Sequence, residues 1–205
     1  MPPVHPPAQP RPFSAARRLV CASLLLAPLG AAAVRIDGFT FDDRLQLAGT
    51  DLLLNGVGLR SAAWLKGFAA GLYLRDRTNA PASALTQAGP KRLQMKMILD
   101  VEATEFVKAF DKSLNRNNTE AERAALKDRV VQFNRSLEQV GKIAKGDVVN
   151  LDFIPGKGLI LSINGTTRGR PLAGEDLYAS LLKVFIGDRP VDPKLKAGLL
   201  GLAPT

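Results

Sequence analysis

The sequence predicts an α+β protein in which helices pack on one face of a large antiparallel sheet. Three observations predict this fold class. A long apolar stretch at 51–74 supplies buried strands, two helical patterns follow one another in the middle of the chain, and closely spaced strands return before a last pair of helices. This order of elements favours helices that are segregated to one face of the sheet.

The stretch 51–74 is almost wholly apolar, is punctuated by glycines and carries only two cations, Arg60 and Lys66. Such a run is typical of strands that are buried on both faces, so we expect two core strands with a bend at 58–64. A guanidinium cannot lose its charge by titration, so its burial requires an anionic partner or a full set of acceptors. We therefore expect Arg60 to lie near whatever the protein binds.

Shorter elements flank this stretch. We expect one strand at 34–41 and a second at 44–48 before it. After it, residues 79–89 are rich in Pro, Ala and Ser and predict a loop with a short helix. The alternating apolar residues of 91–99 predict a further strand.

Two helices are predicted in the middle of the chain. Asp100 is a candidate N-cap for a helix at 102–116, and Thr119 with Glu122 forms a capping-box pair that opens the second helix. Both helices carry apolar residues at helical spacing, which is typical of one face packed on a core. The stripe of the first helix consists of Phe106, Phe110 and Leu114.

The C-terminal third is predicted to be a meander followed by helices. A strand at 147–154 alternates apolar and polar residues, and Asn164 with Gly165 is a strong signal for a two-residue hairpin turn. The last helices are expected at 175–186 and 193–200.

Residues 1–33 have the layout of a secretory signal peptide. Two arginines precede a short apolar run at 19–29, which ends in small residues and an A-x-A cleavage pattern at Ala33. The run is shorter than the ~20 apolar residues that a membrane span needs. We expect a periplasmic or secreted mature domain at 34–205 without a transmembrane segment. An uncleaved interfacial helix and export by the twin-arginine route are the alternatives.

Cleavage after Ala33 would remove both Cys21 and His5, the chain's only cysteine and only histidine. A mature chain without thiol or imidazole excludes disulfides, Cys or His nucleophiles, His-based metal sites and a His acid–base catalyst. We expect neither a metal nor a cofactor.

The charge balance is basic but dispersed. Removing the three arginines of the signal peptide leaves 25 basic residues against 19 acidic ones, a net charge of +6. The cations are spread out and no aromatic platform lies among them, so we expect a soluble surface and no nucleic-acid partner. We expect a monomer that associates at most loosely with anionic envelope surfaces.

Several segments, in this order, resemble the chalcone isomerase family and in particular its bacterial chalcone isomerase-like branch. They are NGVGLR at 55–60, KGFAAGLYL at 66–74, MKMILDVEATEF at 95–106, LKVFIGDRPVD at 182–192 and the closing leucines and glycine at 195–201. The resemblance covers residues 34–201. It implies the family fold, an open-faced β-sandwich whose large antiparallel sheet carries helices on one face.

The resemblance also implies a role for Arg60. In catalytic members the matching arginine stabilises the oxyanion that develops during ring closure, and in fatty-acid-binding relatives it holds the ligand carboxylate. Both roles use a fixed planar cation in a dry pocket. The alternative is an arginine that is paired with a carboxylate at a sheet edge.

The rest of the catalytic apparatus of the family is missing from this sequence. Phe68 stands where the enzymes have a threonine, Phe106 where they have the active-site tyrosine, and Val184, followed by Phe185, where they have a polar residue. Each change removes a group that would position substrate or an ordered water, and no general acid or base remains.

We therefore expect a non-catalytic domain that binds a small amphipathic, fatty-acid-like anion in a cavity lined by Arg60, Phe68, Phe106, Val184 and Phe185. Two alternatives stay open. One is an intramolecular lyase of the chalcone isomerase type with Arg60 as electrophile. The other is an envelope interaction module whose interior is filled and whose surface carries an apolar patch.

Overall fold

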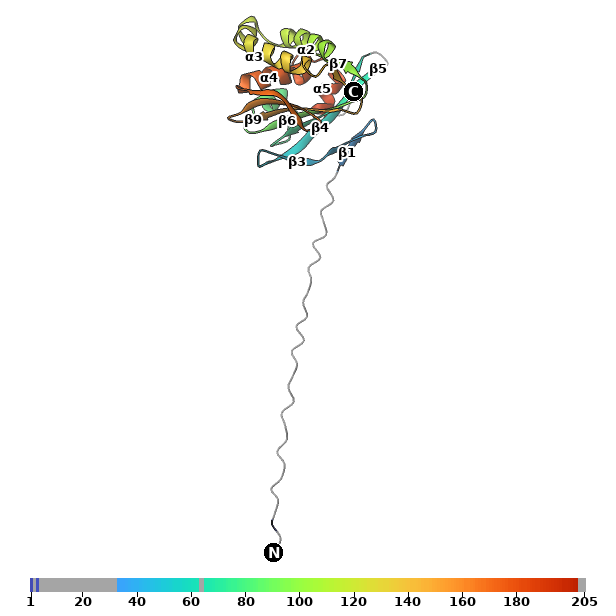
Figure 1. The fold of residues 1–205 in the computed structure, drawn as a ribbon, viewed down its shortest axis with the longest axis vertical. Helices are drawn as coiled ribbons and strands as arrows, with labels where there is room; N and C mark the ends of the chain where they lie inside the picture. Colours follow the sequence, from blue (N-terminus) through green and yellow to red (C-terminus); the bar gives the residue numbers. More distant parts are fainter. Residues whose placement is uncertain (2, 4–32, 63–64, 203–205) are drawn as a thin grey trace. The chain divides into compact units, whose positions relative to one another are not determined.

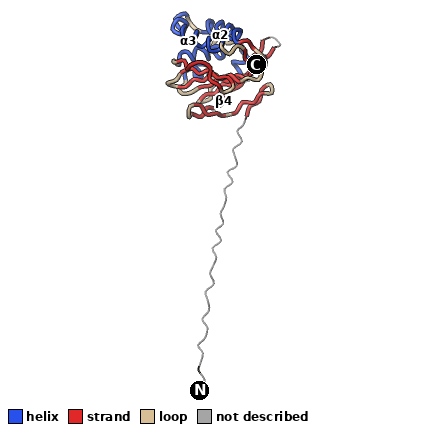
Figure 2. The backbone as a smooth tube through the Cα atoms, viewed as in Figure 1, coloured by secondary structure: helices blue, strands red, loops and turns tan. Residues whose placement is uncertain are grey.

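Seven strands form one antiparallel sheet in the computed structural model, which describes residues 1, 3, 33–62 and 65–202 (Figures 1 and 2). The predicted signal peptide therefore lies almost entirely outside the described residues. In spatial order the strands are β11 (Thr166–Leu172), β10 (Gly158–Ile163), β9 (Val148–Ile154), β6 (Lys91–Met97), β5 (Leu65–Leu74), β4 (Thr50–Ala62) and β3 (Arg44–Leu47).

Helices cover one face of this sheet (Figure 1). Strand β6 shows why: its Leu93, Met95 and Met97 are fully buried and point toward the helices, while the residues between them point to the opposite face. The helices are α1 (Pro81–Thr86), α2 (Ala103–Asn117), α3 (Glu120–Glu138), α4 (Glu175–Ile186) and α5 (Pro193–Leu199). The predicted α+β class, with helices on one face of a large antiparallel sheet, is confirmed.

A small hairpin packs on part of the other face. It consists of β1 (Ala33–Ile36) and β2 (Phe39–Asp42), and its Phe41 is buried in a second apolar cluster that also contains Tyr73. The prediction of one strand at 34–41 is therefore wrong. Asp37 and Gly38 take positive φ angles of 49° and 82°, so the chain reverses within that segment.

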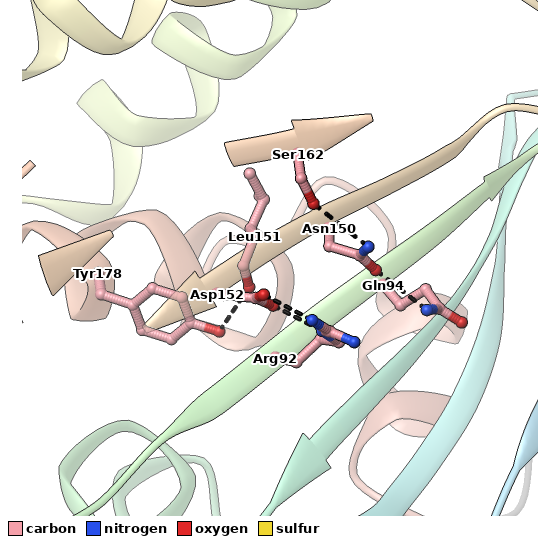
Figure 3. A network of polar contacts seen from close by, with 7 residues as sticks. All are labelled: Arg92, Gln94, Asn150, Leu151, Asp152, Ser162 and Tyr178. Carbon is pink, nitrogen blue, oxygen red and sulfur yellow. Dashed lines mark hydrogen bonds and ion pairs between the residues drawn. The ribbon is translucent and has the colours of Figure 1, made fainter. Parts of the chain in front are cut away.

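The remainder of this face carries a polar ladder across β6, β9 and β10 (Figure 3). Arg92 donates two hydrogen bonds of 2.6 Å to Asp152, and these bonds raise the pKa of the guanidinium. Beside them the Gln94 amide donates to Asn150 (3.0 Å), and Asn150 donates to Ser162 (3.4 Å). Paired side chains of this kind allow a sheet face to remain polar without unsatisfied groups.

Most helix and turn boundaries that were predicted from neighbouring residues in the sequence are correct. The capping box of Thr119 and Glu122 is present, and Asn164 and Gly165 form the predicted hairpin turn with φ angles of 51° and 78°. The N-cap prediction for Asp100 is wrong. Its carboxylate instead accepts from the Lys145 N–H (2.8 Å) and pairs with Lys142 (2.6 Å), so Asp100 ties the start of α2 to the segment after α3.

This tie lies beside a two-stranded ladder that was not predicted, between β7 (Val101–Glu102) and β8 (Lys142–Ile143). No helix in the described part of the chain is both long and apolar enough to cross a membrane.

Candidate functional site

A β-bulge decides which face of the sheet Arg60 occupies. Leu52 and Leu54 of β4 lie in the hairpin-side cluster, but the β4–β5 register shifts at Asn55. The extra residue changes the alternation, so the following even-numbered positions, Arg60 among them, lie on the helix side. The Asn55 amide fixes the bulge, because it donates to the Leu199 carbonyl (2.7 Å) and accepts from the Thr78 N–H (2.7 Å).

Helix α5 packs directly against the glycines of β4. A Cβ atom at Gly56 would lie 2.1 Å from the Gly198 carbonyl oxygen, and one at Gly58 would lie 2.8 Å from the Leu195 carbonyl oxygen. Only glycine permits this approach of the two backbones. The approach brings the first turn of α5 beside Arg60.

Asp192, the N-cap of α5, is the anionic partner of Arg60. Its Oδ1 accepts from the N–H groups of Lys194 (2.8 Å) and Leu195 (3.1 Å), and its Oδ2 accepts from the Ser61 N–H (3.1 Å) and lies 3.5 Å from Arg60 Nη1. The same Nη1 donates to the Ser61 carbonyl. An ion pair between Arg60 and a carboxylate, which is the alternative stated from the sequence, is therefore present in the structure.

The pair leaves part of the guanidinium available. A separation of 3.5 Å is longer than the ~2.7–2.9 Å of a strong charge-assisted hydrogen bond. The Arg60 side chain is 30% exposed, and its Nε and Nη2 have no partner among the described residues. Arg60 can therefore keep Asp192 as a neighbour and still donate to a second anion.

The five residues that the sequence predicted as a site line one cavity of about 330 Å³. The cavity lies on the helix side, between the paired positions Arg60 and Phe68 on the sheet and helices α2 and α4. Its described lining consists of Arg60, Phe68, Phe106, Ala109, Phe110, Lys112, Arg116, Val184, Phe185 and Val191. That these residues contact a ligand remains a prediction.

The cavity has an apolar interior and a cationic mouth. Phe110, Val184 and Phe185 are almost fully buried, whereas Lys112 and Arg116 on α2 are exposed. Sequence reasoning did not include these two cations. They follow Ala109 at three and seven residues, which is helical spacing, so extending the predicted apolar stripe of the helix would have found them.

The described lining contains neither a hydroxyl nor a carboxylate. The chain has two tyrosines, and both are buried elsewhere: Tyr73 lies in the hairpin-side cluster, and the Tyr178 hydroxyl donates to the Leu151 carbonyl (3.2 Å; Figure 3). Burial raises the pKa of both phenols. Neither is placed to act as an acid or base in the cavity.

A second, larger groove of about 930 Å³ lies beyond Asp192. It is lined by residues of strand β1, strand β4 and helix α5. The exposed side chains of Val34 and Leu202 also line it. Asp192 lines this groove while Arg60 lines the smaller cavity, so the ion pair stands between the two. Among its described lining residues the larger groove has no aromatic side chain, unlike the smaller cavity.

The sequence profile described as chalcone isomerase-like matches residues 33–201. The chain belongs to the chalcone isomerase-like family. Membership confirms the resemblance seen in the sequence. Among solved structures, a fatty-acid binding protein of Arabidopsis thaliana is similar, with a TM-score of 0.64 at 17% identity over 82% of this chain and 96% of that chain. No curated protein matches the sequence.

The structural similarity confirms the chalcone isomerase-like fold, in which helices cover one face of a large curled antiparallel sheet. In this family member the open face is divided between the β1–β2 hairpin and the polar ladder of Figure 3. The cavity that Arg60 and the phenylalanines line lies on the opposite, helix-covered face of the sheet.

Proposed function

We propose that this chalcone isomerase-like protein is a non-catalytic binding protein for a small apolar ligand with an anionic head, such as a fatty acid. One observation carries the proposal: Arg60 lies in the wall of a cavity that phenylalanines line and that offers no hydroxyl among its described residues. A fixed cation in an apolar cavity binds an amphipathic anion, because the chain replaces water on the rings and the head takes the free donors.

The cavity volume favours a chain of medium length. At the ~30 Å³ that one water molecule occupies in the liquid, a cavity of about 330 Å³ holds roughly ten non-hydrogen atoms. Native mass spectrometry of the purified protein, followed by organic extraction, tests the proposal. It should find a small acid bound in one copy per chain, or a single site for added decanoate. Protein that carries no such ligand and binds none would contradict the proposal.

The lyase alternative predicts catalysis that this lining does not support. The side chains of Phe68, Phe106 and Val184 offer neither a proton nor a hydrogen-bonding group that would hold an ordered water beside Arg60. We expect the cyclisation of a chalcone to proceed at the spontaneous rate in the presence of the protein, followed by absorbance. Turnover well above that rate, and lost in Arg60→Ala, would establish the lyase.

The interaction-module alternative draws on the larger groove. Val34 and Leu202 are 40% and 45% exposed, and both lie at its rim. A protein that used this groove for a partner would leave the phenylalanine-lined cavity without a ligand. The extraction experiment then returns no bound acid, and the partner accompanies the protein instead.

We also propose that the protein is exported. The support is the pattern of a basic pair, a short apolar run and the cleavage signal at Ala33. N-terminal sequencing of periplasmic or secreted protein should begin within a few residues of Val34. A cytoplasmic pool that retains Met1 would overturn export.

A further inference from the structure

Two cations at the mouth of the cavity are unengaged. Lys112 and Arg116 both line it, and neither forms an ion pair or a side-chain hydrogen bond within the described part of the chain. They stand four residues apart on α2, so their side chains are neighbours on one helix face. Lys108, one turn earlier on the same helix, is by contrast paired with Glu105 at 2.7 Å.

The charges around the cavity do not balance. Arg60, Lys112 and Arg116 line it, and no carboxylate is among its described lining residues. Asp192, which pairs with Arg60, belongs to the wall of the neighbouring groove. With Asp192 counted against Arg60, the two positive charges of Lys112 and Arg116 have no anionic partner among the described residues. A carboxylate head would neutralise only one of them.

We infer that the ligand carries a doubly charged head of the phosphate monoester type. Resting on the proposed function, this inference names the head group that the same cavity prefers. A phosphate monoester carries a charge of about −1.5 to −2 at pH 7 and offers three strong acceptor oxygens. Guanidinium groups match these oxygens with paired donors, and an ammonium group adds a point charge. The apolar chain lies among the phenylalanines, and the head faces Arg60, Lys112 and Arg116.

A purely structural role explains Arg116 but does not explain Lys112. Arg116 lies in the last turn of α2, where a cation stabilises the helix dipole. Lys112 lies a turn earlier, beyond the reach of that effect. The head-group inference accounts for both residues, and the two explanations differ in what a ligand titration measures.

Isothermal titration with decyl phosphate and decanoate, each below its micellar concentration, tests the inference. At pH 7.5 we expect decyl phosphate to bind about tenfold more tightly, as two additional exposed charge contacts would provide. At pH 5.5 the preference should shrink to about two- to threefold, because the second phosphate pKa is about 6. The chain's only histidine is His5, so no imidazole of the described residues titrates in this range.

The double variant Lys112→Gln/Arg116→Gln should lose the preference for the phosphate at pH 7.5, while its affinity for decanoate falls by only about two- to threefold. A matched control is Arg123→Gln/Lys127→Gln. It removes two exposed cations that are also four residues apart, but on α3 and outside this cavity. This control should retain the tenfold preference.

Three outcomes separate the inference from the proposed function. Decanoate that binds as tightly as decyl phosphate overturns the inference and leaves the proposed function standing. A preference that persists in the Lys112→Gln/Arg116→Gln variant also overturns the inference. Failure of both probes to bind the wild-type protein overturns both.

Discussion

Arg60→Met is expected to weaken the binding of decanoate by about 30- to 150-fold, because it removes a charge-assisted contact of ~2–3 kcal/mol. Methionine keeps an apolar stem of similar length in the cavity wall, so the loss reports the head group. Isothermal titration measures it.

The stability of the ligand-free Arg60→Met protein should change by less than about 1 kcal/mol. Its partner Asp192 would still accept from the N–H groups of Ser61, Lys194 and Leu195 and would not be stranded. A matched control is Arg129→Met, which removes an arginine that is paired with Asp176 at 2.7 Å and lies outside the cavity lining. It should leave the affinity unchanged. If Arg60→Met instead lowers stability markedly and leaves affinity intact, Arg60 serves only the fold.

Gly56→Ala should destabilise the protein by about 3 kcal/mol or more, since overpacking of this kind cannot relax by a side-chain rotation. The new Cβ would lie 2.1 Å from the Gly198 carbonyl oxygen and 2.6 Å from the Gly201 nitrogen. Both are backbone atoms, so α5 must move away from β4. Chemical denaturation followed by circular dichroism measures the loss.

The matched control for this variant is Gly67→Ala on the neighbouring strand. Among the described residues its Cβ would meet Arg60 atoms alone, at 3.6 and 3.8 Å, which is ordinary van der Waals contact. We expect a change within about 0.5 kcal/mol. If both variants are equally stable, the close approach of the two backbones is not what holds α5 in place against β4.

Local chemistry explains which parts of the fold were predictable. The capping box of Thr119 and Glu122 and the turn at Asn164 and Gly165 each depend on residues within three positions of one another, and both were correct. The turn at Asp37 and Gly38 is equally local, and its Asp-Gly pair was overlooked within an apparently continuous strand.

The site was predictable in composition but not in geometry. Family resemblance named five residues that line one cavity, yet the face that Arg60 occupies depends on the bulge at Asn55. A one-residue shift moves every following side chain of a strand to the opposite face of the sheet. The alternation of apolar and polar residues alone cannot reveal such a shift. Asp192 meets Ser61 across 131 positions of sequence. Its place before Pro193 marks it as a helix cap but does not reveal Arg60 as its neighbour.

The position of a bound acyl chain decides whether the helix-side cavity is the ligand site. Intermolecular nuclear Overhauser effects between decanoate and ¹³C-labelled protein report which side chains the methylene groups touch. We expect contacts to the rings of Phe106, Phe110 and Phe185, which line the smaller cavity. Contacts confined to Val34 and Val57, in the larger groove, or no contacts from saturated protein, would contradict it.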